Sequence, residues 1–246
     1  MKTAEIQITE TVQESESLVL EEQENGIVRL TLNRPEQFNS LSEAMLATLQ
    51  EKIDAIAENK AAKLVILQGT GKAFCAGHDL KEMIAKREET YYKSLFQQCS
   101  RMMMTLNKIP QPVIARVHGI ATAAGCQLVG ACDLAVASED ARFATSGINV
   151  GLFCSTPSVP VSRNIPRKQA MELLLTGEFI DATTALKWGL INRIAPLEKL
   201  DEEVQKLADA ILSKSSVAVF TGKKMFYKQL EKNMEDAYAF AGEIMA

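Results

Sequence analysis

The sequence has no long apolar run, no excess of one charge and only two histidines. Its 27 Lys and Arg are interspersed with 31 Asp and Glu, for a formal net charge of −4, which leaves no basic stripe for nucleic acid or an anionic membrane surface. No apolar stretch reaches the roughly 18 residues that a membrane-spanning helix needs. Nucleic acid and membranes are therefore poor candidate partners, and an anionic ligand must be bound by local groups.

The five cysteines form no C-x-x-C pair and lie at no spacing to a histidine that suits zinc. They are predicted to be reduced thiols, without a disulfide framework or a metal site. For Cys75, Cys126 and Cys154, which fall in loops, buried filler is favoured over a nucleophile. The start, Met-Lys-Thr-Ala-Glu-Ile-Gln, lacks a signal-type apolar core and the Arg-rich character of a transit peptide. The sequence therefore predicts a soluble, cytoplasmic protein.

The chain is long enough for one large domain with an appendage. Residues 1–16 are polar and acidic without a period, and are predicted to be a flexible segment. Alternating apolar and polar residues around Glu24-Asn-Gly26 predict a hairpin. Strand and helix patterns then alternate to about residue 195, which favours βαβ crossovers and a largely parallel sheet within an α/β fold. Residues 196–246 have helical patterns without matching strands and are predicted to form the appendage.

Capping residues predict several helix boundaries. Ser40-Leu-Ser-Glu43 is able to form a capping box ahead of apolar residues that recur every three or four positions up to Ile56, which predicts a helix with one core face. The charge-rich segment 81–90 is predicted to be solvated, beside the ligand entrance, with a helix over 90–107 after it. Thr156 followed by Pro157 is predicted to be an N-cap with proline at the first helical position.

Two predicted strand-loop-helix units each carry a turn of small residues. The first turn, Gly71-Lys-Ala-Phe-Cys-Ala-Gly-His-Asp-Leu80, follows the apolar run 64–69, and the second follows the run 112–117. In the second turn no side chain between Ala121 and Gly125 is larger than threonine. A ligand can lie against such a backbone, and the first free N–H groups of the helix can point at negative charge. The alternative is that small residues only allow a helix to pack closely on a sheet.

These two turns resemble the signatures of the crotonase (enoyl-CoA hydratase/isomerase) superfamily. Phe74-Cys-Ala-Gly-His-Asp-Leu80 is similar to Phe-x-Ala-Gly-x-Asp-Leu/Ile, and His118-Gly-Ile-Ala-Thr-Ala-Ala-Gly-Cys-Gln-Leu128 is similar to Asn/His-Gly-x-Ala-x-Gly/Ala-Gly/Ala-Gly-Cys-x-Leu. Two further blocks, 33–41 and 175–192, stand in the family order, so the resemblance covers about residues 18–230. The overall pattern looks most like a divergent subgroup, the enoyl-CoA hydratase domain-containing proteins.

The resemblance implies a crotonase-like (ClpP/crotonase) spiral of ββα units over 17–195. It also implies that the C-terminal helices, residues 196–246, pack against neighbouring subunits in a homotrimer or a hexamer built as a dimer of trimers. In the resembled family a further helix with a Phe and basic residues helps to close the CoA site. The sequence given stops at Ala246, and a naturally short chain and a missing tail both stay open.

For the site, the resemblance implies that the backbone N–H groups of His78 and Ala124 form an oxyanion hole for the thioester carbonyl of an acyl-CoA. The CoA thioester would be a substrate, and no resident cofactor is expected. Two preset donors stabilise the negative charge that develops on the carbonyl oxygen. The same match gives further acyl-CoA-binding positions: Gln37, Phe38, Ala76, Asp79 and Leu80. Hydratases commonly carry Lys or Arg near position 37, and Gln37 removes one partner for the CoA phosphates; two alternatives stay open, weaker CoA binding or contact through Lys81 or Arg34 in its place.

The residues that hydratases of this superfamily use for acid–base chemistry are missing. Their two glutamates correspond to Gln127 and Gly147, with Ser146 and Asn149 beside the latter, and a third acid or nucleophile position falls on Ser155. An amide orients water but does not take its proton, and each general acid–base group typically contributes about 10²- to 10⁴-fold. The catalytic candidates are therefore Gln127, Ser146, Asn149 and Ser155, with ordinary hydration disfavoured.

Three hypotheses follow for the activity. The first is an enoyl-CoA hydratase/isomerase-like enzyme with an atypical site, where thioester hydrolysis or decarboxylation would need less acid–base help than hydration. The second is a non-catalytic acyl-CoA-binding or regulatory protein. The third is an interaction protein without a ligand.

Overall fold

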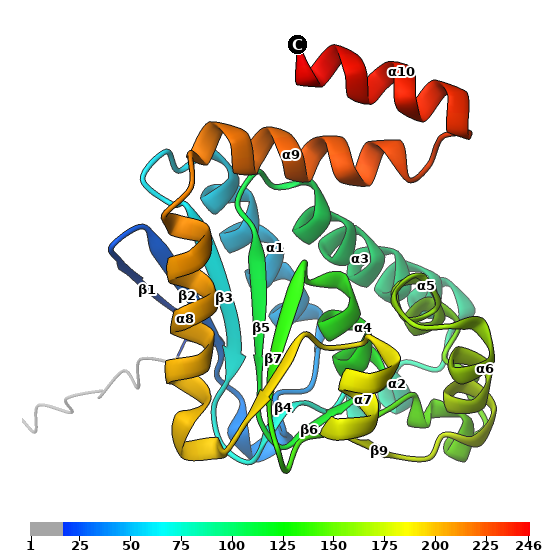
Figure 1. Ribbon diagram of the computed structural model, residues 1–246. Coiled ribbons are helices and arrows are strands. Elements are labelled where there is room, and N and C mark those ends of the chain that lie inside the picture. Colours follow the sequence, from blue (N-terminus) through cyan, green and yellow to red (C-terminus); the bar gives the residue numbers. More distant parts are fainter. Residues whose placement is uncertain (1–16) are drawn as a thin grey trace, which may run out of the picture.

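A computed structural model describes residues 17–246, in which two sheets are surrounded by helices (Figure 1). The segment 1–16, predicted to be flexible, lies outside the described residues. The larger sheet has the strand order β1-β2-β3-β5-β7-β10. Its strands are β1 (Val19–Glu24), β2 (Ile27–Leu32), β3 (Leu64–Gly69), β5 (Val113–Val117), β7 (Leu134–Ser138) and β10 (Arg193–Ala195). β1 and β2 form the predicted antiparallel hairpin, and the other neighbours are parallel, as predicted.

A second sheet, which the sequence patterns did not reveal, has the order β4-β6-β8-β9. It consists of β4 (Ala73–Cys75), β6 (Ile120–Thr122), β8 (Arg142–Ala144) and β9 (Ile180–Asp181). Each of the first three follows directly on a strand of the larger sheet, so that pairs of strands alternate with helices along the chain. This is the predicted spiral of ββα units.

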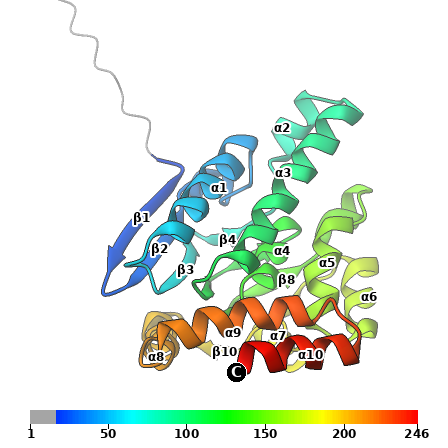
Figure 2. The same ribbon diagram turned by 90° about the horizontal axis from the view of Figure 1, so that it is seen from above.

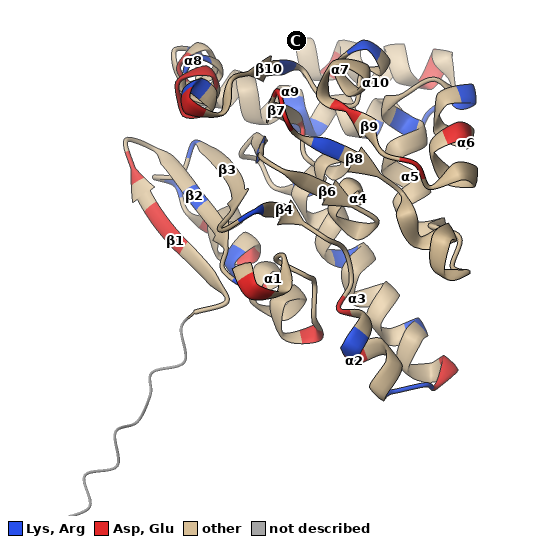
Figure 3. Cartoon of the chain, turned by 90° about the horizontal axis from the view of Figure 1, so that it is seen from below, with Lys and Arg blue, Asp and Glu red and all other residues tan. Residues whose placement is uncertain are grey.

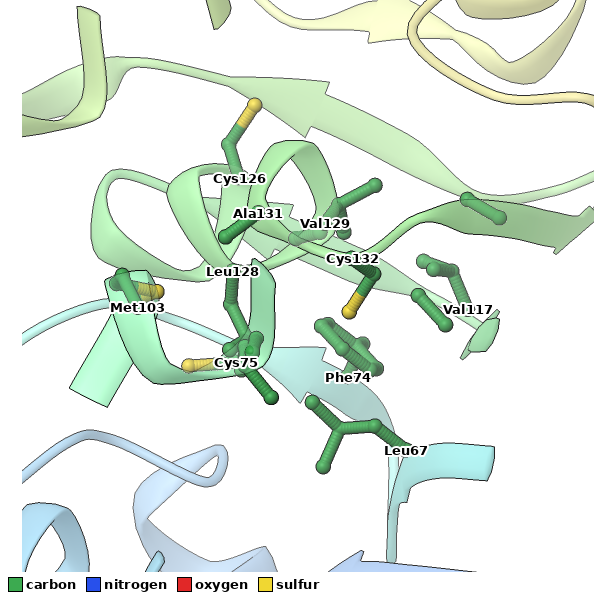
Figure 4. Close-up of a cluster of buried hydrophobic side chains, with 14 of the residues drawn as sticks. Leu67, Phe74, Cys75, Met103, Val117, Cys126, Leu128, Val129, Ala131 and Cys132 are labelled. Atoms are coloured by element: carbon green, nitrogen blue, oxygen red, sulfur yellow. The ribbon is translucent and has the colours of Figure 1, made fainter. Parts of the chain in front are cut away.

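Helices cover both faces of the larger sheet (Figure 1). On one face α1 (Glu43–Glu58), α3 (Glu89–Lys108) and α4 (Ala124–Ala131) enclose the main core, and on the other α8 (Leu200–Leu212) packs on a smaller apolar cluster. Figure 4 shows how Phe74 and Cys75 of β4 lie against Leu128 of α4 within the main core. The second sheet is thus joined to α4, the helix that follows the second small-residue turn.

The remaining helices correct three of the predicted boundaries. Ser42, and not Ser40, caps α1, since its Oγ accepts from Met45 N at 3.1 Å. The charged segment contains a helix of its own, α2 (Leu80–Ala85), capped by Asp79. The N-cap of α5 (Ser155–Asn164) is Cys154, so the predicted cap at Thr156 lies inside the helix. The last elements are α6 (Arg167–Thr176), α7 (Ala182–Trp188) and three 3-10 helices, η1 (Pro35–Gln37), η2 (Ser146–Val150) and η3 (Leu197–Lys199).

The chain ends in two helices, α9 (Ser216–Gln229) and α10 (Met234–Met245), which lie side by side at one edge of the molecule (Figure 2). A buried lysine attaches α9 to the core: Lys223 Nζ donates to Leu106 O at 2.7 Å, to Gln111 O at 2.9 Å and to Asp133 Oδ2 at 2.7 Å. The boundary predicted at residue 195 between core and appendage stays a prediction. Of the helices after it, α8 packs on the larger sheet, whereas α9 and α10 extend away from that sheet (Figure 1).

Charges of both signs are distributed over the described surface (Figure 3). Within residues 17–246, no helix combines the length and apolar character needed to cross a membrane. In the same range, no three side chains of the His, Cys, Asp and Glu types come together as a metal site would require.

Candidate functional site

An apolar pocket of about 290 Å³ lies at the two small-residue turns. Its walls come from the turns themselves, from α2 and α3, and from the loop that leads to α5. The large apolar residues of the lining are Leu80, Met83, Phe96, Val150, Leu152, Phe153 and Pro157, the polar ones are His78, Ser146, Ser155 and Thr156, and Ala76, Ala123, Ala124, Gly147 and Cys154 complete it. No Asp or Glu belongs to this lining in the described part of the chain. A second hollow, of about 480 Å³ beneath α9, includes neither turn.

The two turns contact each other at this pocket. A Cβ built on Gly77 would lie 2.9 Å from Ala123 Cβ and 3.2 Å from Ala124 N, so the two backbones approach more closely than a side chain allows. His78 and Ala124 both line the pocket. Neither backbone N–H has a hydrogen-bond acceptor among residues 17–246. Two unpaired N–H groups therefore lie in adjoining turns on one cavity.

The backbone at the start of α4 is strained. Ala123 has φ 50° and ψ −119°, a combination that glycine adopts readily and that costs another residue about 1 to 3 kcal/mol. Its own N–H donates to Ala144 O at 3.0 Å, which fixes the turn to β8. The next N–H, that of Ala124, is the first of a helix and has no acceptor within α4. Because the start of a helix carries a partial positive charge, this N–H favours a ligand atom that bears negative charge.

The ring of His78 is held between apolar groups. It packs against Phe96 with ring centroids 5.4 Å apart and an interplanar angle of 66°. Both ring nitrogens are buried and have no hydrogen-bond partner in the described residues. Burial lowers the pKa of His78, although the nearby Leu41 carbonyl acts in the opposite direction, and the imidazole is therefore neutral at pH 7.

The catalytic candidates do not all reach the pocket. Ser146 and Ser155 line it; the Ser146 hydroxyl is 2.7 Å from Thr122 Oγ1, and the Ser155 hydroxyl donates to Phe153 O at 3.3 Å. Asn149 is exposed and donates to Gly177 O at 3.3 Å, and it is not part of the lining. Gln127 is only 3% exposed, its Oε1 has no partner among residues 17–246, and it too is absent from the lining.

At position 147 there is no space for a side chain. A Cβ on Gly147 would lie 2.6 Å from Leu152 O and 2.9 Å from Cys154 Sγ. The chain turns back after η2, where Leu152 N donates to Gly147 O at 2.9 Å, and brings these atoms over the glycine. A carboxylate at this position would require the loop to move.

The predicted CoA-binding positions fall into two groups. Ala76 and Leu80 line the pocket. Gln37, at the end of η1, and Phe38, the residue after it, are exposed. Ala76 N donates a hydrogen bond to Phe38 O at 3.0 Å. The Asp79 side chain is turned to Arg34, at 3.0 Å, and to the start of α2.

Of the two cations suggested for the CoA phosphates, Arg34 is occupied by internal contacts, and Lys81 is exposed. Sequence reasoning missed the apolar wall from α2 and α3. The signal was the i, i+3 pair Leu80 and Met83 within a charged run.

Comparisons with known proteins agree with this architecture. The family model described as Enoyl-CoA hydratase/isomerase matches residues 22–245. The rat protein named "Enoyl-CoA hydratase domain-containing protein 3, mitochondrial" is 47% identical over 223 residues, which are 91% of this chain and 74% of the rat protein. The chain belongs to the enoyl-CoA hydratase/isomerase family, and within it to the enoyl-CoA hydratase domain-containing subgroup.

Solved structures give the same result for the fold. The structure of an enoyl-CoA hydratase from Mycobacterium smegmatis is 55% identical with a TM-score of 0.92, covering 94% of this chain and 90% of that one. The structure of human enoyl-coenzyme A hydratase domain-containing protein 3 is 45% identical with a TM-score of 0.90, covering 93% and 90%. The predicted crotonase-type fold is therefore confirmed.

The predicted cytoplasmic location is wrong by this comparison. The rat, frog and human relatives, at 47%, 45% and 46% identity, are all named as mitochondrial proteins. The prediction used the lack of a signal-type apolar core and of a transit-peptide composition in the first residues, and that composition does not determine the compartment.

Proposed function

We propose that this chain binds an acyl-CoA thioester and that the backbone N–H groups of His78 and Ala124 together hold its carbonyl oxygen. One observation carries the proposal: these N–H groups have no acceptor among residues 17–246, lie in turns that touch, and line the same apolar pocket. Both would act as an oxyanion hole, which stabilises charge only where water is excluded. The apolar walls at Met83 and Phe96 supply that condition and suit an acyl chain.

The reaction that this site favours is one with little proton transfer by the protein. The pocket lining contains no carboxylate, and the space at Gly147 is closed, so addition of water to a conjugated double bond lacks both of its usual groups. The hydroxyls of Ser146 and Ser155 are able to orient a water or an acyl group next to a polarised carbonyl. We therefore assign the chain to the enzymes of its family with an atypical reaction at the thioester, such as hydrolysis or decarboxylation.

A non-catalytic acyl-CoA-binding protein is the second candidate. The observation in its favour is that the pocket lining has no carboxylate and that, among residues 17–246, no base is hydrogen-bonded to the Ser155 hydroxyl, which donates to Phe153 O. The fold and the two N–H groups would then serve for binding alone.

The deciding experiment incubates the full chain with a panel of acyl-CoAs. Loss of crotonyl-CoA absorbance reports hydration, release of free thiol reports hydrolysis, and calorimetric titration with butyryl-CoA reports binding. Thiol release that falls in Ser146→Ala or Ser155→Ala but not in Ser158→Ala, a serine on the same helix outside the pocket lining, supports the enzyme. Binding without any product supports the second candidate. Absence of heat with every ester overturns the proposal.

We further propose that the chain assembles as a homotrimer or a hexamer through its last helices. The supporting feature is an apolar surface on α10 in which Met234 and Tyr238 are each 74% exposed and Met245 is 90% exposed. Such a patch on an otherwise mixed surface is typical of an interface. Light scattering after gel filtration should give three or six chains, and Tyr238→Asp should lower that mass, whereas a monomer mass for the unaltered chain would contradict the assembly.

A further inference from the structure

We propose that Arg34 is a positioning residue of this site, which fixes the direction of the His78 N–H by holding the neighbouring residue Asp79. The inference rests on the proposed oxyanion hole, since it concerns how one of its two donors is kept in place. Arg34 itself is not part of the pocket lining.

The guanidinium of Arg34 joins two segments. Its Nη2 donates to Asp79 Oδ2 at 3.0 Å and its Nη1 donates to Ser40 O at 3.0 Å. The other carboxylate oxygen of Asp79 accepts from Lys81 N at 3.1 Å and from Glu82 N at 3.3 Å, the first free N–H groups of α2. One carboxylate thus links the arginine to the helix that forms a wall of the pocket.

The peptide that carries the His78 N–H lies within this network. Leu41 N donates to Gly77 O at 2.8 Å, and Asp79 N donates to Leu41 O at 3.3 Å, so the residues before and after His78 are both bonded to Leu41. Before His78 the chain has one more attachment, since Ala76 N donates to Phe38 O at 3.0 Å. After His78, the Asp79 side chain bonded to Arg34 ties the turn to a residue outside it and so limits how far the His78 peptide turns.

The segment that carries Arg34 is itself firmly held. Asn39 is fully buried, with φ 54°, and its Nδ2 donates to Thr70 O and to Ala73 O at 2.8 Å each. Its Oδ1 accepts from Arg34 N at 2.9 Å. Arg34 is therefore attached through its backbone to the beginning of the first turn and through its side chain to the end of that turn.

Burial makes this ion pair different from one on the open surface. The side chains of Arg34 and Asp79 are 19% and 14% exposed. Burial alone would raise the pKa of Asp79, but the hydrogen bond from Glu82 N and the Arg34 guanidinium together hold that pKa below its usual value. Lysine cannot replace the arginine fully, because only the planar fork contacts two acceptors in fixed directions.

The test compares two ligands that differ in the carbonyl. Butyryl-CoA has the thioester C=O and S-butyl-CoA, a thioether of equal carbon number, does not. Calorimetric titration of the full chain should give the unaltered protein a preference for butyryl-CoA of roughly tenfold, as two ordinary hydrogen bonds imply. In Arg34→Gln we expect the preference to fall to about threefold or less, the share of one remaining donor, with S-butyl-CoA affinity within twofold of the unaltered protein. Arg34→Lys should give an intermediate preference.

Arg116→Gln is the matched control. Arg116 is also a partly buried arginine, 14% exposed, and is paired with an aspartate, but that aspartate, Asp201, lies in α8 and not beside His78. The Arg116→Gln protein should have a lower free energy of unfolding but keep the preference for butyryl-CoA over S-butyl-CoA. If Arg34→Gln keeps the whole preference while the unaltered protein discriminates, the positioning role is overturned. If the unaltered protein binds the two ligands equally, the oxyanion hole itself fails. If Arg34→Gln does not fold, Asp79→Asn replaces it, since the asparagine keeps an oxygen for the α2 N–H groups. The ratio of its affinities for butyryl-CoA and S-butyl-CoA then decides the question.

Discussion

Substitution of Gly125 by alanine should separate the two turns of the site. A Cβ on Gly125 would lie 2.0 Å from Cys75 O and 2.7 Å from Cys75 C. Because non-bonded atoms in contact are about 3.5 Å apart, α4 and β4 must move apart by on the order of 1.5 Å. Overpacking of this kind costs about 1 to 3 kcal/mol, against a gain of at most about 1 kcal/mol from alanine's helix propensity. We expect a net loss of roughly 1 to 2 kcal/mol in the free energy of unfolding.

The effect on the ligand should be larger than the effect on stability. A displacement of about 1 Å at a reacting group can cost 10²-fold, and loss of one oxyanion donor costs about 3 kcal/mol of barrier. In Gly125→Ala the preference for butyryl-CoA over S-butyl-CoA should therefore disappear, and any turnover should fall by about 10²-fold. Calorimetric titration measures the first and free-thiol release the second, with unfolding followed by circular dichroism.

Gly130→Ala is the matched control, since it lies in the same helix. There a Cβ would be 3.3 Å from Pro160 Cβ, which a small adjustment accommodates, so stability should change by less than about 1 kcal/mol and the preference should persist. A Gly125→Ala protein that folds and still distinguishes the thioester from the thioether would refute the proposed convergence of the two N–H groups.

Three further predictions concern single residues. Gly147→Glu should not create hydration of crotonyl-CoA and should lower the unfolding midpoint, because its Cβ meets atoms at 2.6 and 2.9 Å. Lys223→Met removes the cation paired with the largely buried Asp133, which keeps only its bonds from Val113 N and Tyr227, and should cost about 3 kcal/mol in urea unfolding, while the exposed neighbour in Lys224→Met changes stability little. Burial lowers the pKa of His78 and of His118 from the ordinary value of 6.5, so as the pH falls the unfolded chain takes up protons before the folded one does. The free energy of unfolding should therefore be constant above about pH 7 and decrease as the pH falls below about 6.5. The decrease should be less steep in His78→Asn or His118→Asn.

Much of the larger sheet could be predicted from the sequence, because the hairpin of β1 and β2 shows alternation around a turn signal, and β3, β5 and β7 are short, mostly apolar runs. The second sheet could not, since strands of three residues such as Ala73–Cys75 have no period to detect. The helix α2 was not predicted because Lys81 and Glu82 interrupt its apolar residues and the charged segment continues after it. The cap of α1 was placed two residues early, at Ser40, because only Ser40 has a glutamate three residues later, whereas the helix begins at Glu43 and the Ser42 hydroxyl accepts from Met45 N.

For the site, the two turns could be predicted from composition and resemblance, and the structure brings them together at one pocket. The sequence also located Ser146 and Ser155 near it. It could not foresee that Asn149 turns to Gly177, because that depends on the path of η2. Nor could it show that the space at Gly147 is filled, since the atoms concerned come from residues five and seven positions later. The roles of all these residues stay predictions until the ligand experiments are done.

The strained alanine at the start of α4 bears on any attempt to build this chemistry elsewhere. Its methyl group lies against Gly77, in the contact between the two turns. A designer who copied only the two N–H groups onto a new scaffold, with glycine in place of Ala123, would relieve the backbone strain at that position. The same change would remove the methyl group that packs between the two turns. The transplantable unit is therefore the pair of turns with that methyl between them.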